Sequence, residues 1–249
     1  MRLTCVACVL CVPILTCAQE SKSTPPARII VSSPLAIAAD SPVRLLLRGT
    51  HLDEITEIRI TGRDVKVEIA SKGKAMVPPN YDVKKVGDTQ AEIKFTLPPD
   101  TAQSSLQLVA ITASGAGPAY ELALLTSEEL LEEKEPNDGF KSAQPLVDGK
   151  TVVGTIHEPR NVDVFEVKVE AGQKLVVTVR AAQVGSLLDP VLTIYDSAGQ
   201  IVASSDDADG KDPRIESTVS KSGSYYLSLQ DANDSGGPHF AYTLKVVKQ

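Results

Sequence analysis

The sequence of 249 residues contains no tryptophan, and aromatic residues make up only 4% of it. Aromatic rings are the platforms on which proteins stack nucleobases and sugar rings, so this scarcity argues against both kinds of stacking surface. Basic residues are fewer than acidic ones: the chain has 25 Lys and Arg and 32 Asp and Glu, which gives a net charge of −7. That balance excludes the basic footprint of a nucleic-acid-binding protein.

Cysteine is absent from most of the chain. The four cysteines are Cys5, Cys8, Cys11 and Cys17. They lie in residues 1–18, which have an early Arg2, a short apolar stretch and small residues before a polar Gln19, as in a secretory signal peptide. We expect cleavage near Ala18, with lipidation of Cys17 as the alternative. The mature chain is then a secreted, periplasmic or cell-surface protein without thiols, disulfides or a transmembrane segment.

The acidic residues are concentrated in two segments. Residues 128–138 hold six acids and one Lys, and residues 206–212 hold four acids and one Lys. The rest of the chain is nearly neutral, so the acidity is local and does not produce a general surface field.

Short apolar segments recur at the spacing of an all-β sandwich. In the first half they predict strands at 28–32, 43–48, 55–61, 65–70, 91–97, 106–112 and 119–125. Ile93, Phe95 and Leu97 alternate with polar residues, which places apolar side chains on one face of their strand. Seven strands suit one sandwich, and no βαβ spacing appears. We therefore predict a first β-sandwich at 26–125.

Residues 126–138 are predicted to form an acidic helical linker. Thr126 and Glu129 have the spacing of a capping box, and Pro136 would end the helix. A second series of apolar segments predicts a second β-sandwich at 139–249. Its expected strands are 152–156, 162–169, 175–181, 191–196, 201–204, 215–219, 225–230 and 240–247.

The second half resembles a known family. Five runs carry the resemblance: EKEPND from Glu133, DVFEVKVEAGQKLVVTV from Asp163, LLDPVLTIYDSAGQIVASSDD from Leu187, SGSYYLSLQD from Ser222 and AYTLKV from Ala241. In this order, from about residue 133 to the end, they are similar to the bacterial pre-peptidase C-terminal (PPC) domain. The resemblance implies a jelly-roll-type β-sandwich of the kind appended to secreted enzymes, notably peptidases, without a catalytic role. The related collagen-binding modules of clostridial collagenases bind calcium through an acidic segment at the start of the domain.

The first half resembles an immunoglobulin-like module of the TIG/IPT type. The runs LLLRGTHLDEITEIRI, DTQAEIKFTLPPD and AYELALL carry this resemblance, which covers 26–125. It implies an Ig-like β-sandwich, and nothing in this half has the pattern of a catalytic site.

Oxygen-bearing side chains at the start of the second half form a candidate calcium site. The candidates are Glu133, Glu135, Asn137, Asp138 and Asp163. Calcium binds roughly six to eight hard oxygen ligands, and the first four candidates lie within one short segment. The PPC resemblance carries over the same five positions. Relatives often have a further acid where this chain has Arg160 and Asn161, so one ligand is missing. The alternative is an ordered turn without an ion.

A second, weaker metal candidate lies in residues 205–216, SDDADGKDPRIE. It approaches the spacing of a calcium-binding loop, and its candidate ligands are Asp206, Asp207, Asp209 and Glu216. The Ser at its first position, Pro213 at its ninth and the lack of flanking helices favour a solvated acidic hairpin loop.

The Tyr225 and Tyr226 pair is a weak candidate for a ligand surface. Alternation along a strand turns one ring inward and leaves the other on the outer face.

Catalytic patterns are poorly supported. The three histidines, His51, His157 and His239, are scattered, and the sequence has no HExxH, GxSxG or phosphate-binding loop. We expect no enzyme, but an exported non-catalytic binding or scaffolding protein that engages extracellular protein or a cell-surface or matrix polymer, as in adhesion. An accessory protein of a secreted peptidase is the alternative, and a hydrolase is the remote one.

Overall fold

The computed structural model describes residues 25–39, 42–79, 81–98, 104–208 and 210–249. The predicted signal peptide, with its four cysteines, lies outside these ranges, and so does the metal candidate Asp209. None of the helices in the described part has the length and apolar character that a membrane crossing requires.

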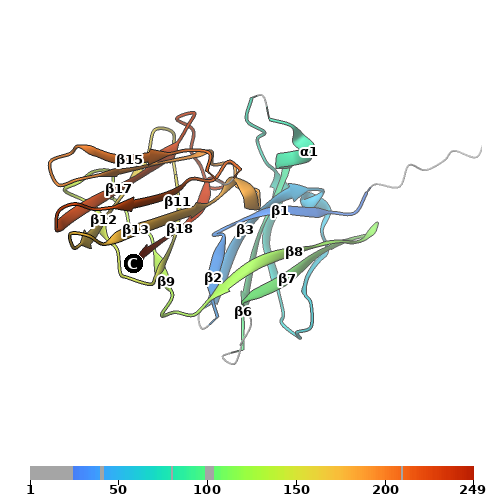
Figure 1. Ribbon diagram of the computed structural model, residues 1–249. Helices are drawn as coiled ribbons and strands as arrows, with labels where there is room; N and C mark the ends of the chain where they lie inside the picture. Colours follow the sequence, from blue (N-terminus) through green and yellow to red (C-terminus); the bar gives the residue numbers. More distant parts are fainter. Residues whose placement is uncertain (1–24, 40–41, 80, 99–103, 209) are drawn as a thin grey trace, which may run out of the picture.

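The first body is a sandwich of two four-stranded sheets, with strand orders β1-β3-β6-β5 and β2-β8-β7-β4 (Figure 1). The strands are β1 Arg28–Ser33, β2 Ala36–Ala38, β3 Pro42–Thr50, β4 Glu57–Ile60, β5 Glu68–Lys74, β6 Thr89–Thr96, β7 Ser105–Thr112 and β8 Gly115–Leu125. A 3-10 turn, η1 Leu52–Glu54, precedes β4, and a short helix, α1 Val83–Val86, precedes β6. The predicted alternation is present in β6, where Ile93 and Phe95 are buried and Lys94 is exposed.

The second body is a sandwich of two five-stranded sheets, with strand orders β10-β12-β17-β14-β15 and β16-β13-β18-β11-β9. The first five strands are β9 Leu130–Glu132, β10 Gln144–Pro145, β11 Thr151–Thr155, β12 Val162–Val169 and β13 Lys174–Arg180. The others are β14 Pro190–Tyr195, β15 Ile201–Ser205, β16 Arg214–Thr218, β17 Gly223–Asp231 and β18 Ala241–Lys248, with a 3-10 turn η2 Ala182–Val184 after β13. The prediction of two all-β sandwiches is confirmed. The short strands β2, β9 and β10 were not predicted, because two or three residues show no alternation.

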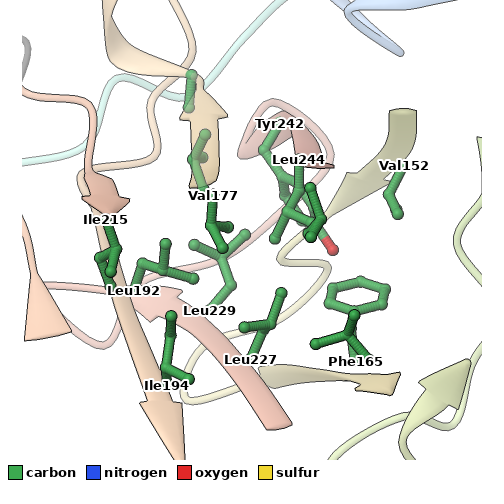
Figure 2. Close-up of a cluster of buried hydrophobic side chains, with 14 of the residues drawn as sticks. Val152, Phe165, Val177, Leu192, Ile194, Ile215, Leu227, Leu229, Tyr242 and Leu244 are labelled. Carbon is green, nitrogen blue, oxygen red and sulfur yellow. The ribbon is translucent and has the colours of Figure 1, made fainter. Parts of the chain in front are cut away.

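The core of the second sandwich is formed by inward-facing aliphatic side chains together with aromatic side chains that include Phe165 and Tyr242 (Figure 2). Both rings are fully buried and meet edge to face, with centroids 6.5 Å apart at 75°. An edge-to-face pair of this kind contributes about 0.5–1.5 kcal/mol beyond the burial of its surface. Tyr242 also carries a hydroxyl into this apolar core, and that hydroxyl needs a polar partner.

The predicted helical linker is wrong beyond its first turn. The capping box forms, because Glu129 N–H donates to Thr126 Oγ1 (3.2 Å) and Thr126 N–H donates to Glu129 Oε2 (3.0 Å). The chain then leaves the turn as β9, which pairs in parallel with β11 and packs the half-buried Leu131 against the second core. A helix this short is marginal in water, so burial of Leu131 and completion of the sheet edge outweigh its local preference.

The two sandwiches pack directly against each other (Figure 1). Val86, from α1 of the first sandwich, is buried in the core cluster of the second, and Val31 of β1 is buried with Ala241 of β18. Gly185 approaches the backbone of Ile30 so closely that a Cβ atom at Gly185 would lie 2.5 Å from the Ile30 carbonyl oxygen. Packed side chains as well as the linker therefore set the relative position of the two sandwiches.

Candidate metal centre

Three carboxylates from distant parts of the sequence meet at one edge of the second sandwich. Glu133 follows β9 in one sheet, Asp163 lies on β12 in the other sheet, and Glu135 lies on the segment that crosses between them. Each offers a carboxylate oxygen, and these oxygens lie within 4.8 Å of one another. Oxygens that bind one calcium ion at about 2.3–2.6 Å are separated by distances of this order.

The three carboxylates differ in how deeply they are buried. Asp163 is completely buried, Glu133 is half-buried and Glu135 is exposed. Glu133 also lines a groove of about 450 Å³ between the sandwiches, whose opposite wall includes Pro34 and Ile37. One side of the cluster therefore reaches into the core, while the other is open to solvent.

The hydroxyl of Tyr242 lies between two acids at the buried end of the cluster. The Tyr242 hydroxyl lies 2.6 Å from Glu133 Oε1 and 2.7 Å from Asp163 Oδ2, and its single proton can serve only one of them. Thr155 N–H donates to Glu133 Oε2 at 2.8 Å. Burial, reinforced by Glu133, raises the pKa of Asp163 to about 10, and burial also raises the pKa of Tyr242. Positive charge at this point would relieve the cost of the two neighbouring acids.

Asn137 adds a buried amide to the carboxylates. Its Nδ2 donates to Glu133 Oε1 at 3.2 Å, while its Oδ1 and Asp163 Oδ1 are both buried with no hydrogen-bond donor among the described residues. A buried acceptor left without a donor costs about 1–3 kcal/mol. Carboxylate and amide oxygens of this kind are the ligands that calcium binds.

Asp138, the remaining predicted ligand, contacts Asn161. Its Oδ1 accepts a hydrogen bond from Asn161 Nδ2 at 3.1 Å, and Asn161 Oδ1 accepts from the backbone N–H of His157 at 3.3 Å. Asp138 therefore ties the crossing segment to the loop before β12. Asn161, at the position where relatives often carry an acid, takes part in this tie through its side-chain amide.

The ordered turn proposed as the alternative also exists. Glu135 Oε2 accepts from the N–H of Asn137 at 3.0 Å, and Glu135 Oε1 lies 2.7 Å from Nδ1 of His157. These contacts hold the segment in the shape that brings Glu135 and Asn137 to the cluster. The turn and the acidic cluster are thus parts of one arrangement.

Sequence analysis missed two residues of this centre. Tyr242 could have been found, because alternation in β18 turns its ring inward and an inward hydroxyl needs a buried partner. The residues next to Gly154 in the sequence form no pattern that would indicate its role. A Cβ atom at Gly154 would lie 2.6 Å from both Glu133 Oε2 and the Tyr242 hydroxyl oxygen, so glycine leaves the space that the cluster occupies.

The second metal candidate shows other contacts. Asp206 Oδ1 accepts from the N–H of Asp207 at 2.9 Å. Glu216 lies on β16, where hydrogen bonds from Lys174 and Arg214 lower its pKa. In the described part of this loop, Asp206, Asp207 and Glu216 do not form a close group of metal-binding side chains of the kind seen around Asp163.

The tyrosine pair divides as alternation predicts, and one of the two joins an exposed aromatic cluster. Tyr225 is buried, and its hydroxyl donates to the Lys221 carbonyl at 2.9 Å. Tyr226 stacks on Phe140, with centroids 4.4 Å apart at 8°, and lies directly opposite Tyr195 of β14. We call Phe140, Tyr195 and Tyr226 the aromatic face. Three of the ten aromatic residues thus gather on one outer surface, which the low average content did not suggest.

Part of the second sandwich matches a known family. Residues 161–231 match the model of the bacterial pre-peptidase C-terminal domain. A stretch of 102 residues is 35% identical to a probable subtilase-type serine protease of Deinococcus radiodurans. The matched stretch is 40% of this chain and 14% of the length of that protein.

Two solved structures are similar to this chain at low identity. The pre-peptidase C-terminal domain of a collagenase from Bacillus anthracis is 17% identical, with a TM-score of 0.36, over 46% of this chain and 99% of that domain. The periplasmic inhibitor of g-type lysozyme from Aeromonas hydrophila is also 17% identical, with a TM-score of 0.36, over 43% of this chain and 96% of that protein.

Proposed function

We propose that this chain is an exported, non-catalytic protein of two β-sandwich modules, which binds an extracellular protein or polymer and whose second module is stabilised by calcium. The observation that carries the proposal is the close group of carboxylates at Glu133, Glu135 and Asp163, beside buried oxygens of Asn137 and Asp163 that have no hydrogen-bond donor among the described residues. The family match at residues 161–231 supports export, since such domains occur in secreted bacterial peptidases.

The donor set suits calcium better than other common ions. Glu133, Glu135 and Asp163 supply three carboxylates and Asn137 an amide, all of them hard oxygen ligands. Zinc prefers nitrogen and sulfur ligands, and magnesium usually binds through one or two carboxylates and keeps several waters. Calcium accepts an irregular set of oxygens and would take water at the exposed side, beside Glu135.

Thermal unfolding of the mature chain tests the calcium site. A ligand that binds only the folded state stabilises it by about 2.7 kcal/mol at a hundred times its dissociation constant. For a module of this size we expect calcium to raise Tm by on the order of 10 °C over the value in chelator. Circular dichroism at pH 7.5, with millimolar calcium or with EGTA, measures the shift.

A matched variant separates site binding from a general effect of calcium. Gly154→Ala keeps every ligand but places a methyl group against Glu133 and the buried Tyr242 ring, so we expect it to lower Tm in chelator and to lose most of the calcium shift. Gly139→Ala, where a Cβ atom meets nothing within 4 Å, should keep the shift. An unchanged Tm in millimolar calcium, or an equal shift in Gly154→Ala, would rule out this site.

The contacts of the histidines support the absence of catalysis. His51 lies beside Glu54, His157 beside Glu135, and His239 against Gln90. Among the described residues, none of these contacts joins an imidazole to a serine or threonine hydroxyl, the nucleophile that a histidine base would activate. We interpret these contacts as structural, and we propose that the protein is not an enzyme.

The aromatic face is the surface that we propose for binding. Phe140 is 38% exposed and lies over the outer face of the sheet that contains β14 and β17, where Tyr195 and Tyr226 are neighbours. Aromatic residues contribute disproportionately to binding at such surfaces. We expect the double variant Phe140→Ala with Tyr226→Ala to lose retention on cell-wall or matrix polymer, measured by co-sedimentation, while its Tm stays close to that of the wild type.

An accessory role beside a secreted peptidase is the second candidate. The stretch that is 35% identical to part of a subtilase-type protease favours it. Pull-down from the secreted fraction distinguishes the two functions. Co-purification of one peptidase would support the accessory role, whereas retention on polymer without a peptidase would support adhesion.

A further inference from the structure

A single histidine is enclosed where the two sandwiches meet. His239 belongs to the loop before β18 and is 4% exposed. Its Nε2 lies 3.2 Å from Oε1 of Gln90, which is on β6 of the first sandwich. Close by, the Tyr81 hydroxyl donates to the carbonyl of Leu187 at 3.4 Å, and the N–H of Leu187 donates to the His239 carbonyl at 3.0 Å. His239 is thus one of the polar contacts across the interface.

The surroundings of His239 accept a neutral ring and disfavour a charged one. When Nε2–H donates to Gln90 Oε1, Nδ1 is a buried acceptor with no partner among the described residues. A proton on Nδ1 would create a buried donor without an acceptor. It would also place a positive charge near Arg48, whose guanidinium is held by the carbonyls of Val86, Gly87 and Met76.

The charged groups around the ring offer no compensation. Burial, followed by the positive charge of Arg48, lowers the pKa of His239 to about 4. Asp88 is the acid that acts on Arg48, and the facing group on β6 is the neutral amide of Gln90. No acid of the described chain forms a salt bridge with the His239 ring.

We propose that the contact between the two sandwiches is an acid-sensitive latch, closed by neutral His239 and opened when His239 takes up a proton. Besides the contacts of His239 and Tyr81, the interface consists of packing such as Val31 against Ala241 and Val86 against the second core, and separation would expose the His239 ring to water together with these side chains. The protein would then change from a packed pair of modules at neutral pH to two modules joined by their linker in acid.

The direction and size of the effect follow from linkage. A lowered histidine pKa means that the closed state resists protonation, so its full stability is present above about pH 6.5 and falls as the pH approaches 4. Each unit by which the pH falls within that window shifts the equilibrium tenfold toward the separated state. The closed-to-open equilibrium constant therefore decreases by about 300-fold when the pH falls through the whole window.

Small-angle scattering of the mature chain tests the latch, with far-UV circular dichroism as the measure of folding. We expect the radius of gyration of the wild type to increase between about pH 6 and pH 4 while the β-sheet signal stays. His239→Gln, which cannot be protonated, should stay compact at pH 4. Gln90→Glu, which places a negative charge beside a protonated His239, should move the transition to lower pH. His51→Asn, a change at a histidine of the first sandwich whose ring lies beside Glu54, should behave like the wild type.

Three results would overturn the proposal. The first is a wild type that stays compact at pH 4. The second is an unchanged transition in both His239→Gln and Gln90→Glu. The third is loss of the β-sheet signal at the same pH as the expansion, since acid would then unfold the modules instead of separating them.

Discussion

Asp163→Asn is expected to make the chelated protein more stable and to abolish its response to calcium. Without an ion at neutral pH, the folded state keeps a proton on Asp163 that the unfolded state has released, because burial and Glu133 raise the pKa to about 10 from 3.8. At pH 7 this difference costs on the order of 4 kcal/mol. An asparagine removes the cost, and its amide can donate to Glu133 as the protonated acid does.

The pH dependence of stability gives the same test a second readout. A carboxyl group whose pKa is raised by folding stabilises the protein fully below its unfolded value of 3.8, and this contribution is lost as the pH rises toward 10. In chelator, the Tm of the wild type should therefore fall from pH 5 to pH 9. Asp163→Asn should show a flatter profile, and so should the wild type in calcium, since the ion binds the ionised carboxylate.

The control for this pair of measurements is the same change at an exposed acid. Asp206→Asn lies in the loop before β16, and it should keep both the calcium shift and the pH profile of the wild type. If Asp206→Asn loses the shift while Asp163→Asn keeps it, the ion binds at the loop and the centre proposed at β12 is wrong.

Phe165→Ala is expected to destabilise the second sandwich by about 3–5 kcal/mol, the range for removing a large aromatic side chain from a packed core. The ring is fully buried and meets the ring of Tyr242, which itself contacts the carboxylates of the metal centre. The midpoint of urea unfolding should fall accordingly, and the variant should also need more calcium for the same stabilisation because the Tyr242 ring loses its packing partner.

Phe140→Ala is the matched control in the same module. The Phe140 ring stacks on Tyr226 at the outer face of the sheet and is 38% exposed, so its removal leaves no cavity. We expect a cost of about 1 kcal/mol or less. If the two variants lose equal stability, the outer aromatic face contributes to folding as strongly as the core does, and its role as a free binding surface would be contradicted.

Part of the candidate metal centre could be predicted from the sequence. In β12 the inward positions alternate from Asp163 to Phe165 and Val167, so an acid occupies a core position and must have a partner. The segment from Glu133 to Asp138 supplies nearby oxygens by its composition. Because both signals are local, the candidate ligands could be named before the fold was known. The different positions of Asp163 and Asp138 could not be predicted in the same way. Asp163 contacts Tyr242 and Asp138 contacts Asn161, and both contacts join residues that are far apart in the sequence.

The linker and the aromatic face show where local patterns fail. Thr126 and Glu129 form their capping box, yet the chain becomes β9 because a distant strand, β11, offers it a sheet edge. Similarly, the aromatic face combines Phe140 of the crossing segment with rings of β14 and β17, which are far apart in the sequence. Composition averages over the whole chain and therefore carries no information about such clusters.

The sequence by itself determines the all-β class of this protein and its longer strands, because alternation of apolar and polar side chains is a property of neighbouring residues. It also places the acids at the start of the second module and on the inward face of β12. Only the tertiary structure decides that Tyr242 stands between two of those acids and that His239 is enclosed between the sandwiches. Both depend on which distant surfaces are packed together, and burial of that kind sets the charge state of a side chain more strongly than its neighbours in sequence do.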